Sequence, residues 1–544
     1  MKKLLNSVVL MVPFMVLALL VWRVGSAPAA EQKLNMELVG TNDLQARSTY
    51  QPTVHRYPGD RYIFFGGEHP LATNPVTKQP LPSLNPLTGQ NEPNGTSIVD
   101  VTDPANPKYL AHIPVGTTGN GGAQMVRVCD GSTLPVHNTK VYMLRSYATG
   151  NPGAHELWDV TDPSKPVGVF TVAGGNPIIG DLATTHKSWW ECDTGIAYIV
   201  GRRNVDTADG WQPGNEHHIF IFNLGDPTKP PDFLRDWALD GQQPGGVLPP
   251  HFTLIPQIHG PISTGPSPAH VLLNDSPNPI NATGATLDRV YFAYGISDNG
   301  VMQIVDRTKL LPPPWGTGVR CGSIAHTFLP GDPPECKDFH SAEVGRWVMN
   351  PVNGAHTSYP IGNIAVPDFA VNGEGAVRDF VVVTSEETSN QCTGPRNLTS
   401  IVEVTENVDG QPGSRPQSQA TFQVLEEKGE FCDAGGRFGP HSTQEEFGPP
   451  FYQKMIFVAY FDAGVRAVDI RDPFRPTEVG FYIPATTANT DLRCVDNNTP
   501  GTCKVVIQTN NAATDDRGFI YIADRADTGL HILKLTGKAA EVIK

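Results

Sequence analysis

An apolar strand followed by Asp-Pro-x-x-Pro recurs along this chain and restricts its fold more than any other feature. The aspartate side chain can accept hydrogen bonds from the backbone N–H groups just after it, and the first proline presets the φ that a tight turn requires. The second proline cannot donate to a strand ladder, so it starts the next strand at its edge or keeps the loop out of one. Four copies are complete: Asp103 to Pro107, Asp162 to Pro166, Asp226 to Pro230 and Asp472 to Pro476.

The strand before this turn can be aligned seven times, in three cases without the prolines. The seven copies begin at Ser97, Glu156, Ile221, Met302, Ser400, Arg466 and His531. Each follows another apolar strand, and these begin at Tyr62, Val141, Ala197, Val290, Phe380, Ile456 and Phe519. The chain therefore repeats one unit of strand, turn, strand, Asp-Pro turn and strand.

Such units cannot bury both faces alone, but a radial arrangement packs each sheet on its neighbours and closes the ring. The sequence predicts an all-β fold, a seven-bladed β-propeller with long loop insertions, over residues 31–544. The 50 prolines and 54 glycines and the lack of any sustained 3.6-residue apolar period agree with many short strands. The extra length falls in insertions at 62–97, 224–288 and 307–379. Two separate β domains are the alternative, and the even spread of the copies favours a single ring.

The N-terminus predicts export. Lys2 and Lys3 precede the apolar run from Val8 to Trp22, and "SAPAAEQ" supplies small residues for cleavage after Ala30. Residues 1–30 are therefore expected to be a signal peptide, and the protein periplasmic or secreted. An uncleaved anchor is the alternative, although the run is short for a spanning helix of about 20 residues. We expect no other contact with the membrane.

Charge and cysteine content agree with an exported protein. Cleavage would leave 37 basic against 55 acidic residues, a formal net charge of −18, and we therefore expect no nucleic acid partner. Eight cysteines in an exported chain predict disulfide bonds. Cys321–Cys336 and Cys494–Cys503 are the expected pairs, because each lies within one Gly/Pro-rich loop, whereas the other four cysteines remain unassigned.

The repeat also resembles a known family. The string Asp-Val-Thr-Asp-Pro-x-x-Pro, after an aromatic or aliphatic strand, resembles the LVIVD repeat of bacterial exported β-propellers. The resemblance covers most of the mature chain and implies the fold more firmly than a function. In architecture and histidine usage the chain is more distantly similar to the selenium-binding-protein/methanethiol oxidase propellers, and that likeness implies copper.

Histidines recur just before the first strand of most units, the position that faces the central channel of a propeller. The residues expected to bind a metal are His55, His186, His259, His356 and His441, with His270 in reserve. Two units carry amides there instead, Gln124 and Asn511. Neutral imidazole suits copper, iron or zinc, with copper favoured, and Glu191 and Glu445 are the expected proton-transferring catalytic residues. The alternative is that these histidines only bond the backbone of the next blade. His217 and His218 are expected at the surface.

Two functions remain open. The first is a metal-dependent oxidoreductase that acts on a small-molecule substrate within the channel. The second is a binding or scaffold propeller of the cell envelope without chemistry, whose long loops hold a protein or polysaccharide partner. A hydrolase propeller with axial calcium ranks last, because calcium prefers carboxylate and amide oxygens to histidine. No nucleophile elbow, P-loop, dinucleotide fingerprint or HExxH motif is present in the sequence.

Overall fold

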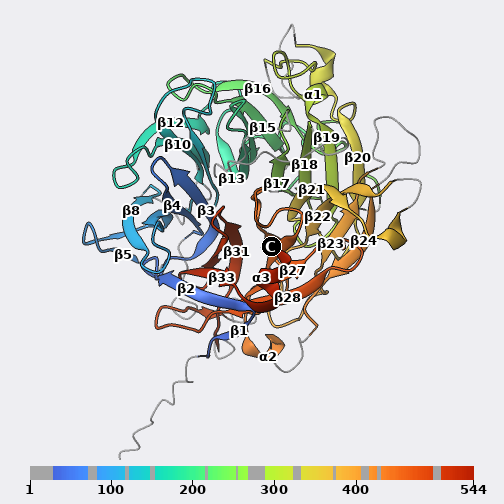
Figure 1. Cartoon of the computed structure of the whole chain (residues 1–544). Coiled ribbons are helices and arrows are strands. Elements are labelled where there is room, and N and C mark those ends of the chain that lie inside the picture. Colours follow the sequence, from blue (N-terminus) through green and yellow to red (C-terminus); the bar gives the residue numbers. More distant parts are fainter. Residues whose placement is uncertain are drawn as a thin grey trace, which may run out of the picture.

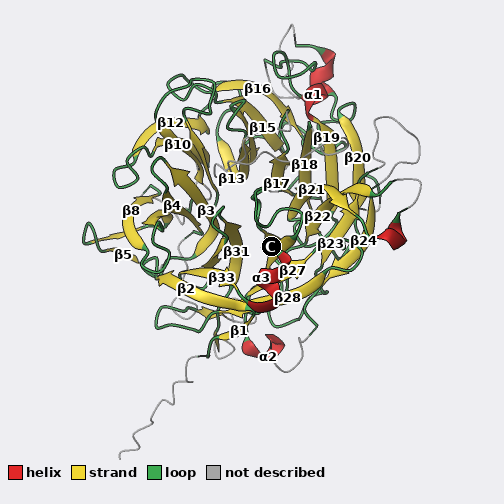
Figure 2. Ribbon diagram, in the orientation of Figure 1, coloured by secondary structure: helices red, strands yellow, loops and turns green. Residues whose placement is uncertain are grey.

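Seven antiparallel sheets surround a central axis in this computed structural model (Figure 1). The structure describes residues 29–70, 83–116, 122–147, 153–214, 218–250, 252, 255–266, 288–322, 332–371, 375–405, 416–425, 431–493 and 504–544. Nearly all of the regular structure is strand, with a few short helices at the periphery and near the C-terminus (Figure 2). The predicted seven-bladed β-propeller is confirmed.

The blades follow one another along the chain, and we number them in that order. Blade 1 consists of β3 (Thr49–Tyr57), β4 (Arg61–Glu68), β7 (Gly95–Asp100) and β8 (Lys108–Pro114), and blade 2 of β9 (Val126–Asp130), β10 (Val141–Tyr147), β11 (Ala154–Asp159) and β12 (Val167–Ala173). Blade 3 consists of β13 (Leu182–Trp190), β14 (Ile196–Arg203), β15 (His218–Asn223) and β16 (Asp232–Trp237), and blade 4 of β17 (Ile258–Ser263), β18 (Arg289–Tyr294), β19 (Val301–Asp306) and β20 (Glu343–Val348).

Blades 5 to 7 complete the ring, and the two last blades also take up the N-terminal strands. Blade 5 consists of β21 (Thr357–Ala365), β22 (Val377–Thr384), β23 (Thr399–Glu403) and β24 (Gln417–Phe422). Blade 6 consists of β25 (Ser442–Thr443), β26 (Met455–Ala459), β27 (Val465–Asp469), β28 (Thr477–Ile483) and β1 (Gln32–Leu34). Blade 7 consists of β31 (Thr509–Thr514), β32 (Phe519–Asp524), β33 (Leu530–Leu535) and β2 (Met36–Asn42).

The short elements lie in the insertions and at the C-terminus. They are the hairpins β5 (Ser83–Asn85) with β6 (Gln90–Glu92) and β29 (Leu492–Arg493) with β30 (Lys504–Val505), the helices α1 (Arg307–Leu310), α2 (Cys432–Ala434) and α3 (Gly537–Val542), and the 3₁₀ turns η3 (Pro334–Lys337) and η4 (Asp368–Ala370). None of the helices in the described ranges has the length and hydropathy that crossing a bilayer requires.

The ring is closed by pairing of the two ends of the described chain. Met36 lies opposite Leu535, so the N-terminal strand β2 becomes the outermost strand of blade 7. The preceding strand β1 pairs with β28 at the edge of blade 6. Both closures cover an edge strand whose N–H and C=O groups would otherwise be unpaired.

The Asp-Pro turns form as the sequence predicts. In each complete copy the aspartate Oδ1 accepts the backbone N–H two residues later, at 3.0 to 3.1 Å. The aspartate carbonyl accepts the N–H three residues later, at 2.9 to 3.1 Å. Four separate segments therefore repeat one turn geometry, and each turn joins the third strand of its blade to the fourth.

The apolar core lies mainly between adjacent blades. Ile63 and Phe65 of blade 1 pack in one buried cluster with Val126 and Val128 of blade 2. On the other side of blade 1, Phe64 joins a cluster with blade 7. Alternate residues of a strand point to opposite faces, so each blade contributes to two such layers. This inter-blade packing positions the innermost strands around the axis.

Three disulfides join loops and blades. Cys321–Cys336 is present as predicted. Cys129–Cys192 joins blade 2 to blade 3, and Cys392–Cys432 joins the loop between β22 and β23 of blade 5 to the segment between blades 5 and 6. The predicted pair Cys494–Cys503 lies outside the described residues.

Candidate functional site

The innermost strands contact one another in a closed circle around the axis. In ring order these strands are β3, β9, β13, β17, β21, β25 and β31. Residues near the starts of these strands therefore converge at one end of the channel. Four of the five histidines proposed as ligands meet there, and we call His186, His259, His356, His441 and Tyr50 the histidine hub.

The imidazole rings of the hub lie against one another. Nε2 of His186 lies 3.0 Å from Nε2 of His259. The ring centroids of His259 and His356 are 3.8 Å apart, and those of His356 and His441 are 4.2 Å apart. Two nitrogens bound to one ion at about 2.0–2.1 Å would also stand roughly 3 Å apart. The spacing thus suits a shared cation.

Oxygen acceptors fix the orientation of two of these rings. Nδ1 of His186 donates to Oε1 of Gln124 at 2.9 Å, and Nδ1 of His441 donates to the carbonyl of Asn510 at 2.6 Å. A neutral imidazole that donates through Nδ1 has its lone pair on Nε2. Metal-binding histidines are usually held by such a hydrogen bond on their other nitrogen. Nε2 of His441 makes no hydrogen bond within the described residues.

The hub histidines are buried and neutral. Burial is the main reason that the pKa of His186 and the pKa of His441 both fall to about 3. The pKa values of His259 and His356 also lie well below 6.5, again chiefly because of burial. Neutral imidazole is the form that binds transition metals. All four rings are therefore in the ligand form at neutral pH.

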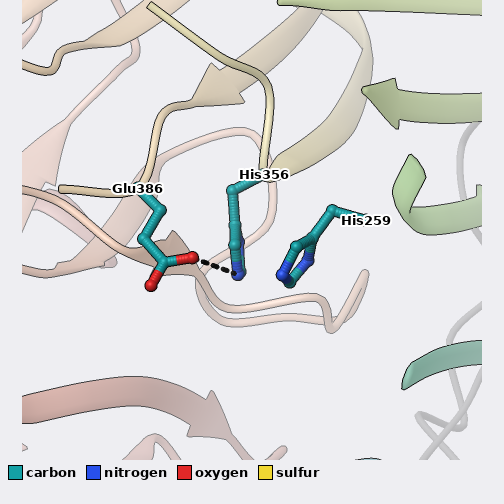
Figure 3. A group of neighbouring side chains, drawn as sticks. All are labelled: His259, His356 and Glu386. Atoms are coloured by element: carbon teal, nitrogen blue, oxygen red, sulfur yellow. Dashed lines mark ion pairs between the residues drawn. The ribbon is translucent and has the colours of Figure 1, made fainter. Parts of the chain in front are cut away.

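A carboxylate that the sequence analysis did not single out completes the site. One ligand atom each from His259, His356 and Glu386 lie within 4.8 Å of one another, and Figure 3 shows the three side chains pointing together. The Glu386 carboxylate lies 3.9 Å from Nε2 of His356 and 3.8 Å from Nε2 of His441. Burial by itself would raise the pKa of Glu386, but nearby positive charges, those of Arg437 and Arg525 among them, outweigh burial, and the pKa lies below 4.5.

Tyr50 occupies the place that histidine takes in other blades. Its hydroxyl and Nε2 of His356 share a hydrogen bond of 2.7 Å, and its ring packs edge-on against His186 and His441. Burial raises the pKa of Tyr50 well above 10, so the phenol stays protonated. Tyr50 therefore places a hydroxyl group among the imidazole nitrogens.

His55 does not join the hub. It lies five residues further along β3 than Tyr50, about 16 Å at 3.3 Å per residue. It pairs with Ile63 near the β3–β4 turn, and its Nε2 lies 3.1 Å from Asp130. From the sequence, His55 was expected just before the first strand of its blade. This placement was wrong, because β3 already begins at Thr49 and His55 lies within the strand. The reserve candidate His270 lies outside the described residues.

The two glutamates predicted to transfer protons lie outside the hub. Glu191 is fully buried and accepts from Nε and Nη2 of Arg307 at 2.8 and 2.7 Å. Glu445 forms buried ion pairs with Arg127 and with Lys187, the residue next to His186. Burial alone would raise the pKa of Glu445, but Lys187 and Arg127 lower it below 4.5. The structure thus shows both carboxylates held by cationic side chains.

The amides predicted at the channel mouth support the hub histidines. Gln124 accepts from His186, and Oδ1 of Asn511 lies 2.6 Å from Nδ1 of His441. His218, in contrast, was expected at the surface, but it is fully buried in β15 with Nε2 3.0 Å from Asp206. His217 lies outside the described residues.

Antiparallel pairing explains why Glu386 was missed. His356 donates its backbone N–H to Thr384 at the end of β22, so the residues just after a second strand lie beside those just before a first strand. In the sequence, Glu386 follows "FVVVTS" as Glu68 follows "YIFFGG" in blade 1. Reading both ends of each hairpin together would have found this position.

The chain matches no protein-family model, and no curated protein matches it in sequence. Among solved structures it is similar to Sqt1 of Chaetomium thermophilum bound to the N-terminus of the ribosomal protein L10, with 9% identity, a TM-score of 0.43, and 92% of this chain and 99% of that chain covered. It is similar to the Cps50 (Swd1) β-propeller domain of Myceliophteria thermophila, with 7% identity, a TM-score of 0.40, and 89% and 97% covered. A third is the GH93 α-L-arabinofuranosidase of Fusarium graminearum with arabinobiose, with 11% identity, a TM-score of 0.37, and 83% and 98% covered.

Proposed function

We propose that this propeller binds one transition metal ion at the histidine hub. The observation that carries the proposal is the convergence of four buried, neutral imidazoles, two of which donate through Nδ1 to an oxygen and therefore carry the lone pair on Nε2. Imidazole donors suit copper, iron and zinc, and we favour copper because of the histidine-rich donor set. His186, His259, His356 and His441 would hold the ion.

The other residues of the site would set its charge and its protons. Glu386 supplies a buried negative charge beside two of the imidazoles, so we assign the carboxylate role at the hub to Glu386 before Glu191 or Glu445. Tyr50 keeps a protonated hydroxyl there. Gln124 and the Asn510 carbonyl hold the rings of His186 and His441 in place.

A bound copper or iron ion would supply redox chemistry, whereas zinc would supply Lewis acidity. We therefore infer a metal-dependent oxidoreductase acting on a small substrate. The distant likeness to the copper-associated selenium-binding-protein/methanethiol oxidase propellers supports this inference. Three disulfides in the described part of the chain support an oxidising compartment, and hence export of the protein.

Metal analysis of untagged protein purified from its exported compartment tests the proposal. Wild type should carry about one equivalent of copper, iron or zinc, and His356→Gln should bind that ion at least tenfold more weakly, a loss of the size seen when even supporting residues of metal sites are changed. His531→Gln is the matched control, because His531 is also a buried histidine but pairs within blade 7.

A second readout keeps the test independent of folding. The electron paramagnetic resonance spectrum of Cu(II)-loaded wild type should show coupling to imidazole nitrogens, unchanged in His531→Gln and altered in His356→Gln. Far-ultraviolet circular dichroism and thermal melting would verify that both variants fold. Absence of stoichiometric metal in wild type, even after incubation with each ion, overturns the proposal and leaves the scaffold function.

A further inference from the structure

A cavity of about 470 Å³ opens beside the histidine hub, between the loops of blades 3, 4 and 5. Its volume falls within the roughly 300–1,000 Å³ typical of small-molecule sites. The side chains that matter for its chemistry are Ile255, Gln257, Ile296, Ser297, Asp298 and Thr388. Thr388 is exposed, so the cavity is accessible from solvent at this rim.

Two of the three residues shown in Figure 3, His259 and Glu386, are each two residues from a residue that lines the cavity. Gln257 stands two residues before His259, and its carbonyl accepts the N–H of Gly295 at 2.7 Å. Ile296 accepts the N–H of Glu386 at 3.0 Å, and Thr388 lies two residues after Glu386.

His356 is tied to the same loop. Gly295 forms a bridge with Ala355, the residue before His356, and Ala355 donates its N–H to Tyr294 at 3.0 Å. His259 and Glu386 are therefore each two residues from a residue that lines the cavity, and His356 directly follows a residue that is bridged to one. Backbone hydrogen bonds and short stretches of chain therefore connect the lining of the cavity to the hub.

The lining of the cavity contains a strained residue. Ile296 has φ +52°, a left-handed conformation that is unfavourable for a β-branched side chain. Such strain persists only where the surroundings hold it. The Glu386 N–H bonded to the Ile296 carbonyl is one such restraint. The conformation holds the Ile296 side chain at the cavity.

The lining favours a particular class of ligand. Aliphatic side chains and neutral polar groups dominate, and among the described residues that line the cavity Asp298 is the one charged side chain, with no lysine or arginine beside it in that set. The chain as a whole carries a formal net charge of −15. Both the local and the overall charge disfavour anions and favour neutral or cationic molecules.

We propose that this cavity is the substrate site and entrance of the histidine hub, and that it admits small, partly apolar organic molecules that are neutral or cationic. This inference rests on the proposed function, because a ligand in the cavity is a substrate only if the histidine hub binds a metal. The cavity itself rests only on the described geometry.

The test uses Co(II)-loaded full-length protein and imidazole probes. The visible absorption of Co(II) would report binding of 4-phenylimidazole, histamine and imidazole-4-acetate. Thr388→Trp would fill the rim, and Thr477→Trp, at an exposed position of β28, is the matched control. Thr388→Trp should keep its Co(II) content and spectrum but bind 4-phenylimidazole at least tenfold more weakly, whereas Thr477→Trp should behave as wild type.

The charge of the ligand is tested separately. Wild type should bind histamine more tightly than imidazole-4-acetate, and Asp298→Asn should reduce that preference about fivefold, as expected for one charge a few ångströms away in water. Unchanged 4-phenylimidazole binding in Co(II)-loaded Thr388→Trp overturns the cavity as entrance. A preference for the anionic probe overturns the ligand class.

Failure of the metal site gives a distinct result. If wild type takes up no Co(II), the proposed function fails, and saturation-transfer NMR of 4-phenylimidazole with the metal-free protein then tests the cavity alone. Binding that Thr388→Trp abolishes supports a small-molecule site at this position. Absence of binding to wild type overturns it.

Discussion

Glu446 should make the protein less stable as the pH rises from acid to weakly alkaline. Its side chain is only 8% exposed, and Oε2 accepts from the N–H and hydroxyl of Thr514 at 3.1 and 3.4 Å. Burial, with a further contribution from the charge of Glu445, raises the pKa of Glu446 from 4.5 to about 8. The folded protein therefore keeps a proton that the unfolded chain releases above pH 4.5.

The sign and size follow from this difference in proton binding. Between pH 4.5 and pH 8 the folded state holds one more proton than the unfolded state, so the free energy of unfolding falls as pH rises. At about 1.36 kcal/mol for each pKa unit, the full effect is about 5 kcal/mol, of which about 4 kcal/mol falls between pH 5 and pH 8.5. Glu446→Gln carries no titrating group and should lack this loss.

Urea denaturation at pH 5 and pH 8.5, followed by tryptophan fluorescence, measures the effect. Glu446→Gln should match wild type at pH 5 and exceed it by about 4 kcal/mol at pH 8.5. Glu37→Gln, at a half-exposed position of β2, is the control and should leave the pH dependence unchanged. A difference between wild type and Glu446→Gln that stays within about 1 kcal/mol at both pH values would refute a protonated, buried Glu446.

Three further predictions concern stability away from the hub. Arg307→Met should lower the free energy of unfolding by about 3–5 kcal/mol, because it leaves the Glu191 carboxylate buried without its cation, and adding Glu191→Gln should recover much of that loss in the same denaturation assay. His155→Gln should stabilise the protein by about 2 kcal/mol at pH 5 but not at pH 8. The reason is that burial lowers the pKa of His155 to about 3, so at pH 5 only the unfolded chain takes up a proton at this residue. Equal effects of the substitution at the two pH values would contradict this. Replacing Cys129 and Cys192 together by serine should cost about 4 kcal/mol, since this disulfide closes a loop of 63 residues, and a melting temperature unchanged from wild type would argue against that constraint.

Much of the fold could be predicted because the sequence encodes its repeated turn and its strands locally. Each Asp-Pro turn is encoded by residues next to one another, such as Asp162 and Ser164, and its hydrogen bonds form within those few residues. Strand identity follows from equally local apolar runs, so all seven second and third strands lie where the sequence places them. The number of blades then follows from counting.

Which histidines converge was predicted in part. His259, His356 and His441 each lie next to the first residue of an innermost strand, a position that follows from the repeat, whereas His186 is the fifth residue of β13. His55 was assigned wrongly and Tyr50 overlooked, because β3 begins six residues before His55 and a shift along the strand moves a side chain to the other end of the channel. The first residue of a strand depends on the pairing of both strands of a hairpin, which the local sequence specifies poorly.

The sequence by itself determined the strands, the turns and the seven-fold repetition, because these depend on neighbouring residues. Only the tertiary structure decided how β2 closes blade 7, since Met36 meets Leu535 at the far end of the chain. It also decided that Glu386 joins His259 and His356, and that Arg307 holds Glu191. These contacts join residues that are distant in sequence, and they form because packing of the blades around one axis brings the ends of separate strands together.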